Sequence, residues 1–529
     1  MNPFEQYAYS YPSSGSSADT NPAQKRASPG TPEWYGVSDD NLLVQIWEYL
    51  AVKDGHKHRR LSKQMVRVCT RALESKLELS PEQAVAWVDA MAGRNVFLSG
   101  GAGVGKSHTL KKIVQYLTPE TYQVTASTGC AASIIGATTL HSTVGIGLGQ
   151  SPAWVYVKKI QENNRWCYER LRKMKTLIID EVGMLDAATF DKAGRVTAMV
   201  RRNYTGDLCA NQAAFVDWDD VQLICCGDFL QLPPVQASTK GWVFEAKSWP
   251  QMRFRNHLLT LVHRQSGDPE FAEILGRARM GRATQTDVDY LLANAASAPP
   301  EGALHLFAKN EPADQVNETE FKKLIASGAK PHPFKAMDHG PEHMLKSCPA
   351  PAKLWVCEGA RVMVLRNLDM GIVNGSLGTV EKVTVHTETT AGHNPRVTGA
   401  SIAVKLDGAL GQEPFTYTFH TYDSERPASE TDRVYKFSVK EGNKVVAYRI
   451  QIPLRLAWAT SIHKAQGMSL DRVIIDFKGC FENGQAYTAL SRLKTIAGGY
   501  LGNLLLRHLK MISLKALGWY QKLEVQSWA

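Results

Sequence analysis

The chain has 529 residues, of which 44% are hydrophobic, so it is long enough for about three or four domains with cores of their own. Lys and Arg outnumber Asp and Glu by 61 to 51. The net charge of +10 favours a polyanionic partner, although a merely soluble basic protein would look the same. The nine cysteines show no Cys-x-x-Cys pair, and no apolar run is long enough to cross a membrane. These features argue against a disulfide framework, a zinc site and a membrane protein.

The first 78 residues predict two segments outside any compact core. Ser, Pro and Gly fill 15 of the first 40 positions, which is typical of a disordered tail. Residues 41–78 carry apolar residues at helical spacing and predict a helical extension. The basic cluster at residues 53–63 fits either a DNA contact or a solvated helix face.

From residue 79, short apolar strands alternate with helical stretches, which is the pattern of parallel α/β sheets. Within residues 79–255, strands are expected at 95–98, 122–126, 176–179 and 221–225. In a second α/β unit, residues 256–375 and 451–529, they are expected at 304–308, 361–365 and 473–477. Between its two parts, residues 376–450 alternate polar and apolar residues and predict an inserted small β-rich domain.

The strongest chemical signal is a phosphate-binding loop. Residues 100–107, GGAGVGKS, follow an expected strand and precede a helix, as this motif requires. Its glycines let backbone N–H groups curl around phosphates, while Lys106 reaches the β- and γ-phosphates and Ser107 completes a Mg²⁺ shell. The nucleotide-binding residues expected here are Gly101, Ala102, Gly103, Val104, Gly105, Lys106, Ser107 and His108.

Two acids at the end of a later strand complete the pattern of an NTPase. Residues 176–181, TLIIDE, form an apolar strand that ends in Asp180 and Glu181. Two buried carboxylates are costly unless a cation shares them. Asp180 is therefore expected to hold Mg²⁺, and Glu181 to orient and deprotonate the attacking water. Gln231, in residues 227–235 (GDFLQLPPV), follows another strand and can hydrogen-bond the γ-phosphate.

This series of motifs resembles the superfamily 1, group B helicases, specifically the petite-integration-frequency (Pif-type) DNA helicase family with its RecD-like relatives. Five further stretches carry the resemblance in the family's order: 79–83 (LSPEQ), 125–142, 263–265 (HRQ), 458–467 (WATSIHKAQG) and 485–492 (QAYTALSR). One departure is Gly183, which stands where relatives usually carry Ser.

The resemblance implies roles for single residues. Gln83 would read the adenine, and Gly467 would lie beside the nucleotide. Arg264 and Arg492 would reach the γ-phosphate from the second of two RecA-like P-loop domains, so that ATP bridges both. DNA contacts are implied at Thr128, His141, Phe229, His463 and Lys464.

The resemblance also implies two accessory elements. Residues 376–450 would form a small Src-homology-3-like β-barrel, entered through a tight turn at Asn374 and Gly375. Residues 143–171 would contain the element that splits the duplex. The aromatic side chains of that segment, which could stack on bases or simply fill the core, are Trp154, Tyr156 and Trp166.

The sequence thus predicts an ATP- and Mg²⁺-dependent DNA helicase that moves along single-stranded DNA, 5′→3′ by resemblance, and opens duplex junctions in replication, repair or recombination. We expect an intracellular monomer, in the cytoplasm of a bacterial or phage-infected cell or in a nucleus or mitochondrion, with protein partners from a replication or repair complex. Two alternatives stay open: a translocase that strips proteins from single-stranded DNA, and the motor subunit of a nuclease complex.

Overall fold

The computed structural model describes residues 77–527 apart from gaps at 136, 148, 204–216, 235–239, 346–347, 367, 369–371, 373–375, 389–395, 408–413, 421–434 and 442–443. The expected tail, nearly all of the expected helical extension and the turn at Asn374 and Gly375 lie outside the described residues. Among the residues that are described, no helix is both long and apolar enough to span a bilayer.

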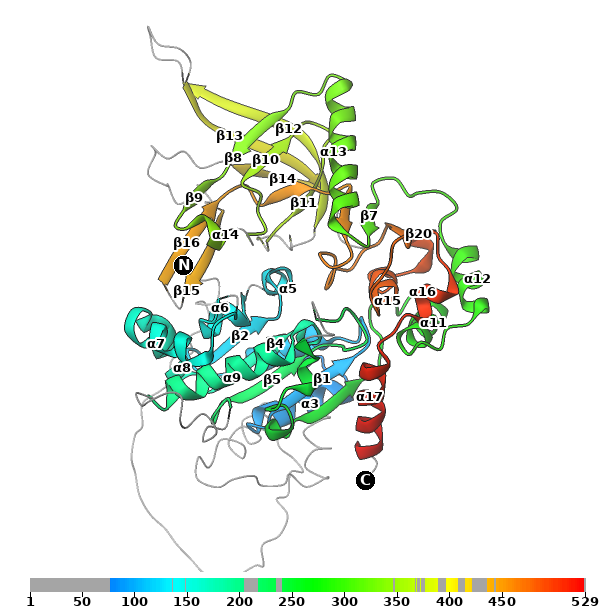
Figure 1. Cartoon of the computed structure of the whole chain (residues 1–529). Coiled ribbons are helices and arrows are strands. Elements are labelled where there is room, and N and C mark those ends of the chain that lie inside the picture. Colours follow the sequence, from blue (N-terminus) through cyan, green and yellow to red (C-terminus); the bar gives the residue numbers. More distant parts are fainter. Residues whose placement is uncertain are drawn as a thin grey trace, which may run out of the picture.

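The first sheet has six parallel strands in the order β3-β2-β4-β5-β1-β6 (Figure 1). Its strands are β1 (Val96–Gly100), β2 (Tyr122–Ala126), β3 (Thr138–Thr139), β4 (Thr176–Asp180), β5 (Gln222–Cys226) and β6 (Arg255–Leu259). The helices of this part are α3 (Pro81–Met91), α4 (Lys106–Val114), α5 (Gly129–Ile134), α6 (Leu140–Val144), α7 (Ala153–Asn163), α8 (Arg165–Lys173) and α9 (Ala187–Arg201).

Strands β1 and β4 are buried along their whole length, and their alternate residues enter two different cores. Phe97, Leu177 and Ile179 lie in one core, whereas Leu98 and Ile178 lie in the other. Because both faces of the sheet are covered, these strands read in the sequence as continuous apolar runs.

The second parallel sheet has the order β18-β7-β19-β20. Its strands are β7 (Leu304–Phe307), β18 (Ala459–Ser461), β19 (Val473–Asp476) and β20 (Gly499–Gly502). The helices of this part are α11 (Pro269–Arg279), α12 (Gln285–Asn294), α13 (Asn310–Ala326), α15 (Gln485–Leu490) and α16 (Leu506–Lys510). A separate core, which includes Leu306, Val473 and Ile475, packs around this sheet.

Antiparallel sheets occupy the stretch between α13 and β18, at the top of Figure 1. A five-stranded sheet consists of β11 (Arg361–Val364), β12 (Leu377–Glu388), β13 (Arg396–Leu406), β14 (Phe415–His420) and β17 (Leu454–Leu456). Two smaller sheets contain β8 (His332–Lys335), β9 (Met337–His339), β10 (Lys353–Val356), β15 (Lys436–Glu441) and β16 (Lys444–Ile450), and α14 (Glu342–Leu345) lies between β9 and β10 in the chain.

The strand expected at 361–365 exists, but its expected partners were wrong. It is β11, and it pairs antiparallel with β12 and β17 rather than joining the second parallel sheet. A four-residue buried run has the same apolar pattern in either kind of sheet, so periodicity could not assign it. The Arg361 side chain, which binds the Asp407 carboxylate, holds this strand against the loop after β13.

The last helix, α17 (Leu514–Ser527), also departs from expectation. The sequence placed it with the second α/β unit, yet Ala516 and Tyr520 belong to the core of the first sheet, together with Phe97 and Phe229. Figure 1 shows α17, in red, running from the second sheet down beside the first. The chain therefore leaves the first sheet after β6 and returns to it at its described end.

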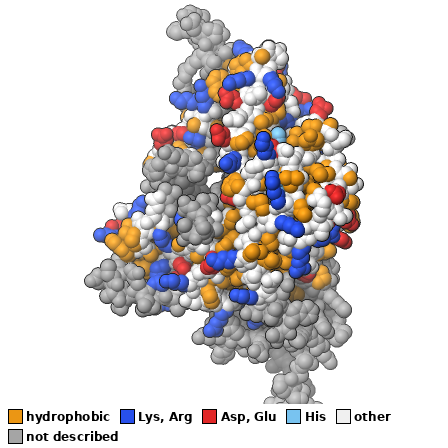
Figure 2. All heavy atoms as spheres, turned by 45° about the vertical axis from the view of Figure 1, so that its right-hand side comes forward, with side chains coloured by type: hydrophobic (Ala, Val, Ile, Leu, Met, Phe, Trp, Pro, Cys, Tyr) orange, Lys and Arg blue, Asp and Glu red, His pale blue; other side chains and the backbone are white. Residues whose placement is uncertain are grey.

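The space-filling view gives no single basic surface. Figure 2 shows Lys and Arg side chains spread over the upper and lower parts of the face that it presents, interleaved with hydrophobic ones. On this face the basic side chains thus mark no single place for a polyanion.

Candidate active site

The phosphate loop lies between β1 and α4, as the motif predicted. Gly100, Gly103 and Gly105 have positive φ angles of 140°, 81° and 84°. A Cβ atom at Gly100 would lie 2.3 Å from the Leu259 carbonyl oxygen of β6, so the loop leaves no room for a side chain there. Lys106 Nζ donates to the carbonyl oxygens of residues 100 and 101, at 2.9 and 2.7 Å, which holds its charge inside the loop.

Gln83 packs directly on this loop. It lies in the first turn of α3, where its Oε1 accepts the Ser80 N–H at 2.9 Å in a capping box. Its Nε2 donates to the Val104 carbonyl oxygen at 3.3 Å. Each polar end of Gln83 thus already has a partner in the chain, and its adenine-reading role stays a prediction.

The acidic pair lies at the carboxyl end of β4, next to the phosphate loop. Burial raises the pKa of Asp180, and the same effect, followed by the nearby Asp180 carboxylate, raises the pKa of Glu181 to about 7. Gln466 Nε2 donates to Glu181 Oε2 at 3.0 Å, and Ser127 Oγ donates to the Glu181 carbonyl oxygen at 2.7 Å. The positive charge of the nearby Lys106 offsets only part of the rise in pKa of both acids.

The residues present fit a magnesium–nucleotide complex. Asp180 is buried and has no cationic ion-pair partner among the described residues, although Lys106 is near enough to affect its pKa. Ser107, in the first turn of α4, is exposed. Across the described residues no cluster of three or more His, Cys, Asp or Glu side chains could hold a metal alone. Mg²⁺ bound through one carboxylate, a hydroxyl and substrate phosphates needs no such cluster.

Two buried arginines complete the cleft. Arg492 follows α15 and is 2% exposed, and its Nε donates to the Thr488 carbonyl oxygen at 2.9 Å. Arg264 Nη1 donates to the Ser491 carbonyl oxygen at 2.8 Å. Burial, and then the positive charge of Arg492, lower the pKa of Arg264 to about 9. Burial likewise lowers the pKa of Arg492. Two desolvated guanidinium groups so placed favour an anion between them.

Arg264 lies in the segment that joins the two parallel sheets. It follows β6, which pairs with β1 at the edge of the first sheet, and its assignment to the second domain stays a prediction. The backbone N–H of Arg264 donates to the Gly103 carbonyl oxygen at 3.2 Å. Gln265 Nε2 donates to the Leu493 carbonyl oxygen at 2.7 Å, which links this segment to the second sheet. The expected boundary at residue 255 would place most of β6 in the second unit, whereas β6 pairs with β1 of the first sheet, because its sequence is too polar to predict a buried strand.

Tyr487 is a residue that the sequence reasoning did not single out. Its hydroxyl accepts the Ala102 N–H of the phosphate loop at 2.7 Å. Burial raises the pKa of Tyr487 to about 12, so the hydroxyl keeps its proton. The helical pattern of residues 485–490 could have indicated an inward-facing tyrosine, but only the tertiary structure supplies its partner.

The segment after β5 brings Gln231 into the same cleft. Gln231 is buried, and its Nε2 lies 3.4 Å from Asp228 Oδ2. Asp228 makes a two-point contact with Arg279 of α11, with N–O distances of 2.9 and 2.8 Å. A Cβ at Gly484 would lie 2.3 Å from the Gln231 carbonyl oxygen, so the second sheet packs closely on this segment.

The residues expected to contact DNA lie on different segments and have different surroundings. Thr128 Oγ1 accepts the Ala131 N–H at the start of α5, and His141 lies in α6. His463 Nε2 lies 2.8 Å from Glu482 Oε2, and Lys464 lines a pocket beside α13.

The expectation that Phe229 contacts DNA was wrong. Its side chain is 0% exposed and stacks on Phe97 with ring centroids 5.1 Å apart, so it serves the core of the first sheet and not a DNA strand. An aromatic residue in a motif looks alike in sequence whether its ring points to solvent or to the core.

The segment expected to split duplexes is helical. Trp154 in α7 and Tyr156 are partly buried against the first core, which is the structural fate that the sequence left open for them. Trp166 in α8 is 52% exposed. It is the aromatic of this group that stays available for stacking.

Two parallel sheets, a phosphate loop with its acidic pair, and arginines directed at that loop define a P-loop nucleotide-binding protein with two RecA-like sheets. Comparison with known proteins makes this specific. The PIF1-like helicase family matches residues 78–287. A crystal structure of Pif1 helicase from Candida albicans is 30% identical in sequence, covers 84% of this chain and 99% of its own, and superposes with a TM-score of 0.68. The chain belongs to the PIF1-like helicase family.

Two further relatives extend the comparison. The ATP-dependent DNA helicase PIF1 of Xenopus laevis is 34% identical over 442 residues, which is 81% of this chain and 62% of that protein. Pif1 helicase from Bacteroides, in complex with ADP-AlF₃ and single-stranded DNA, is 25% identical, covers 89% of this chain and 98% of its own, and has a TM-score of 0.53. This chain spans about three fifths of the length of the curated relatives that it matches.

Proposed function

We propose that this chain is an ATP-dependent DNA helicase. The observation that carries the proposal is the meeting of both sheets at one phosphate loop. Arg492 and Tyr487 come from the second sheet, while Lys106, Asp180 and Glu181 come from the first. A triphosphate bound there would contact both halves, so its hydrolysis would change the attraction between them.

In this function the chain's own side chains would divide the work. The loop amides and Lys106 bind the phosphates. Glu181, with a pKa of about 7, accepts a proton from the attacking water at neutral pH. Arg264 and Arg492 offset the negative charge of the transferring phosphoryl group, and Gln231 responds to the γ-phosphate.

Magnesium would be held by Asp180 and the Ser107 hydroxyl together with the phosphates. The ion supplies charge neutralisation on the β- and γ-phosphate oxygens. In this arrangement Asp180 serves as a ligand and Glu181 stays available as the base.

Coupling to DNA has a direct route through Glu181. The two side chains that hold it, Ser127 and Gln466, each lie within two residues of an expected DNA contact, Thr128 and Lys464. A strand bound at either contact would therefore shift the surroundings of the base. A solved relative bound to single-stranded DNA supports this substrate, and another, described as DNA unwinding at forked double-stranded DNA by two coordinating Pif1 helicases, supports duplex junctions. The 5′→3′ polarity rests on family resemblance.

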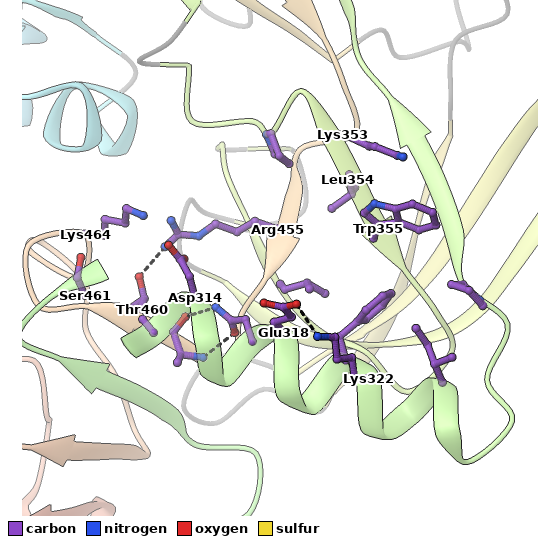
Figure 3. A pocket seen from close by; sticks show the side chains of 18 residues that line it. Asp314, Glu318, Lys322, Lys353, Leu354, Trp355, Arg455, Thr460, Ser461 and Lys464 are labelled. Carbon is purple, nitrogen blue, oxygen red and sulfur yellow. Dashed lines mark hydrogen bonds and ion pairs between the residues drawn. The ribbon is translucent and has the colours of Figure 1, made fainter. Parts of the chain in front are cut away.

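A pocket of about 600 Å³ beside α13 supports a path for the strand. Figure 3 shows Lys464, Ser461 and Thr460 at one end and Trp355 with Lys353 at the other. Trp355 is 38% exposed, and Lys353 Nζ lies 4.4 Å from its ring centroid. An exposed aromatic ring beside cationic side chains is suited to stack a base and to attract its phosphate.

The arrangement of the sheets supports a division into domains. We propose a first RecA-like domain at residues 79–259 completed by α17, a second at about 260–331 and 457–512, and an inserted antiparallel domain at 332–456. The insertion is wider than the 376–450 of the sequence expectation because β11 and β17 share its main sheet. A Src-homology-3-like barrel in this insertion, a monomeric state and an intracellular location stay proposals by resemblance.

Steady-state ATP hydrolysis, with and without single-stranded DNA, tests the proposal. We expect DNA to stimulate wild type at least tenfold, and Lys106→Ala to lose at least about 100-fold of the stimulated rate. Lys111→Ala, an exposed lysine of the same helix, is the matched control and should keep wild-type turnover. A wild type that DNA leaves unstimulated would contradict the proposal. Strand separation on tailed duplexes, against displacement of a bound protein, then distinguishes a helicase from a protein-stripping translocase.

A further inference from the structure

The hydroxyl of Tyr520, in α17, touches both segments that border the nucleotide cleft. Tyr520 is 3% exposed. Its oxygen lies 2.5 Å from Ser99 Oγ, in the strand that leads into the phosphate loop. It also accepts the Phe229 N–H at 3.1 Å and lies 3.2 Å from Asp228 Oδ1, in the segment that leads to Gln231. One hydroxyl thus bonds to the bases of the two segments.

A residue that precedes the second sheet also contacts Asp228 and Tyr520. Arg279, the last residue of α11, makes the two-point contact with Asp228, and its guanidinium carbon lies 5.0 Å from the Tyr520 ring centroid. Burial alone would raise the pKa of Asp228, but the charge and hydrogen bonds of Arg279 outweigh it and lower that pKa. The pair is therefore ionised, and breaking it would leave an uncompensated buried charge.

The anchoring of α17 is separate from this hydroxyl. Trp519 stacks on Phe244 with ring centroids 5.3 Å apart and meets Phe97 and Phe229 edge-on at 5.4 and 4.9 Å. These contacts hold the helix on the first core by apolar burial. The hydroxyl of Tyr520 is therefore not needed to attach the helix to the first core.

We propose that Tyr520 is a positioning residue of the ATP site: it fixes the Asp228–Arg279 pair relative to Ser99, and so sets Gln231 against the phosphate loop while the second sheet moves. This inference rests on the proposed function. A change in the position of Gln231 when the γ-phosphate binds or leaves is transmitted to the second sheet through Asp228 and Arg279. Tyr520 keeps these residues at a fixed distance from the phosphate loop. Loss of the hydroxyl lowers turnover, because the γ-phosphate contact is misplaced, but leaves nucleotide binding by the loop intact.

The test compares Tyr520→Phe with Trp519→Phe in the full chain. Tyr520→Phe removes only the hydroxyl, whereas Trp519→Phe removes apolar contact and keeps the Tyr520 hydroxyl. Three quantities are measured: the Kd of a fluorescent ATP analogue, kcat at saturating single-stranded DNA, and Tm. We expect Tyr520→Phe to lower kcat about fivefold or more, with Kd within about twofold. Trp519→Phe should lower Tm at least as much as Tyr520→Phe does, and it should leave kcat within about twofold of wild type.

A further variant checks the path itself. Arg279→Lys keeps the charge but cannot make the two-point contact, so it should give the same split between kcat and Kd. If kcat falls in step with Tm in both aromatic variants, or if Tyr520→Phe keeps wild-type kcat, this inference is overturned while the proposed function stands. A wild type that does not hydrolyse ATP overturns both.

Discussion

The nucleotide cleft and the pocket beside α13 use charged side chains in opposite ways. In the cleft, Arg492 and Asp180 are buried, and each is held by a short hydrogen bond within its own segment, to the Thr488 carbonyl oxygen at 2.9 Å and from the Glu181 N–H at 2.8 Å. In the pocket, Lys353 and Trp355 stand partly in solvent, and Glu318 is neutralised by Lys322 at 2.6 Å, on its own helix. Burial makes each contact in the cleft strong and difficult to replace, whereas solvent screening makes each contact in the pocket weak and exchangeable. Single substitutions should therefore separate the two regions by the size of their effect.

The largest effect is expected from Arg492→Ala. Removal of a guanidinium group that offsets charge on the transferring phosphoryl group lowers kcat by about 10³-fold or more, with a much smaller change in nucleotide Kd. Single-turnover hydrolysis and equilibrium binding of a fluorescent ATP analogue measure the two quantities. Arg472→Ala, an exposed arginine of the same part of the chain, serves as control. A Kd that rises as steeply as kcat falls would make Arg492 a binding residue instead.

Glu181→Gln should come next, with a loss in kcat of about 10²- to 10⁴-fold. Its raised pKa adds a pH dependence whose sign is fixed, because only the deprotonated carboxylate can accept a proton. For wild type, kcat/KM should rise with pH through about 7, since burial and Asp180 raise the pKa of Glu181 to that value. The acid limb should disappear in the Gln variant. If the acid limb of the pH profile persists in the Gln variant, a group other than Glu181 causes it.

The smallest effect is expected in the pocket. Trp355→Ala should weaken single-stranded DNA binding by about 1 kcal/mol, or roughly fivefold, because one stacking surface is lost. Hydrolysis at saturating DNA should stay at the wild-type rate. Fluorescence anisotropy of a labelled oligonucleotide measures the affinity, and Leu292→Ala, an exposed apolar residue of α12 outside the pocket, is the comparison variant. A loss of 100-fold or more would abolish the distinction between cleft and pocket.

The same contrast explains what could be predicted from sequence. The phosphate loop and the Asp180–Glu181 pair were found because few residue patterns satisfy a phosphate and a metal at the end of buried strands. Pairings across the chain could not be found that way. Strand β6 was assigned to the second unit because it is polar, and Phe229 was assigned to DNA although its ring fills the core. The contacts of Tyr487 and Tyr520 join residues more than 280 positions apart, beyond the reach of local pattern.

The return of α17 to the first sheet has a consequence for synthesis of the protein. The core around Phe97 and Phe229 is incomplete until Tyr520 has been made, although β6 ends at Leu259. At about 5–20 residues per second, the ribosome needs roughly 10 to 50 s to cover that distance. During this interval the antiparallel insertion becomes complete at Leu456 and the second sheet at Gly502, while the core of the first sheet still lacks α17. Of the three described parts, the first sheet is thus translated before the other two, yet its core is the last to be complete, and nascent-chain chaperones would have most reason to cover it.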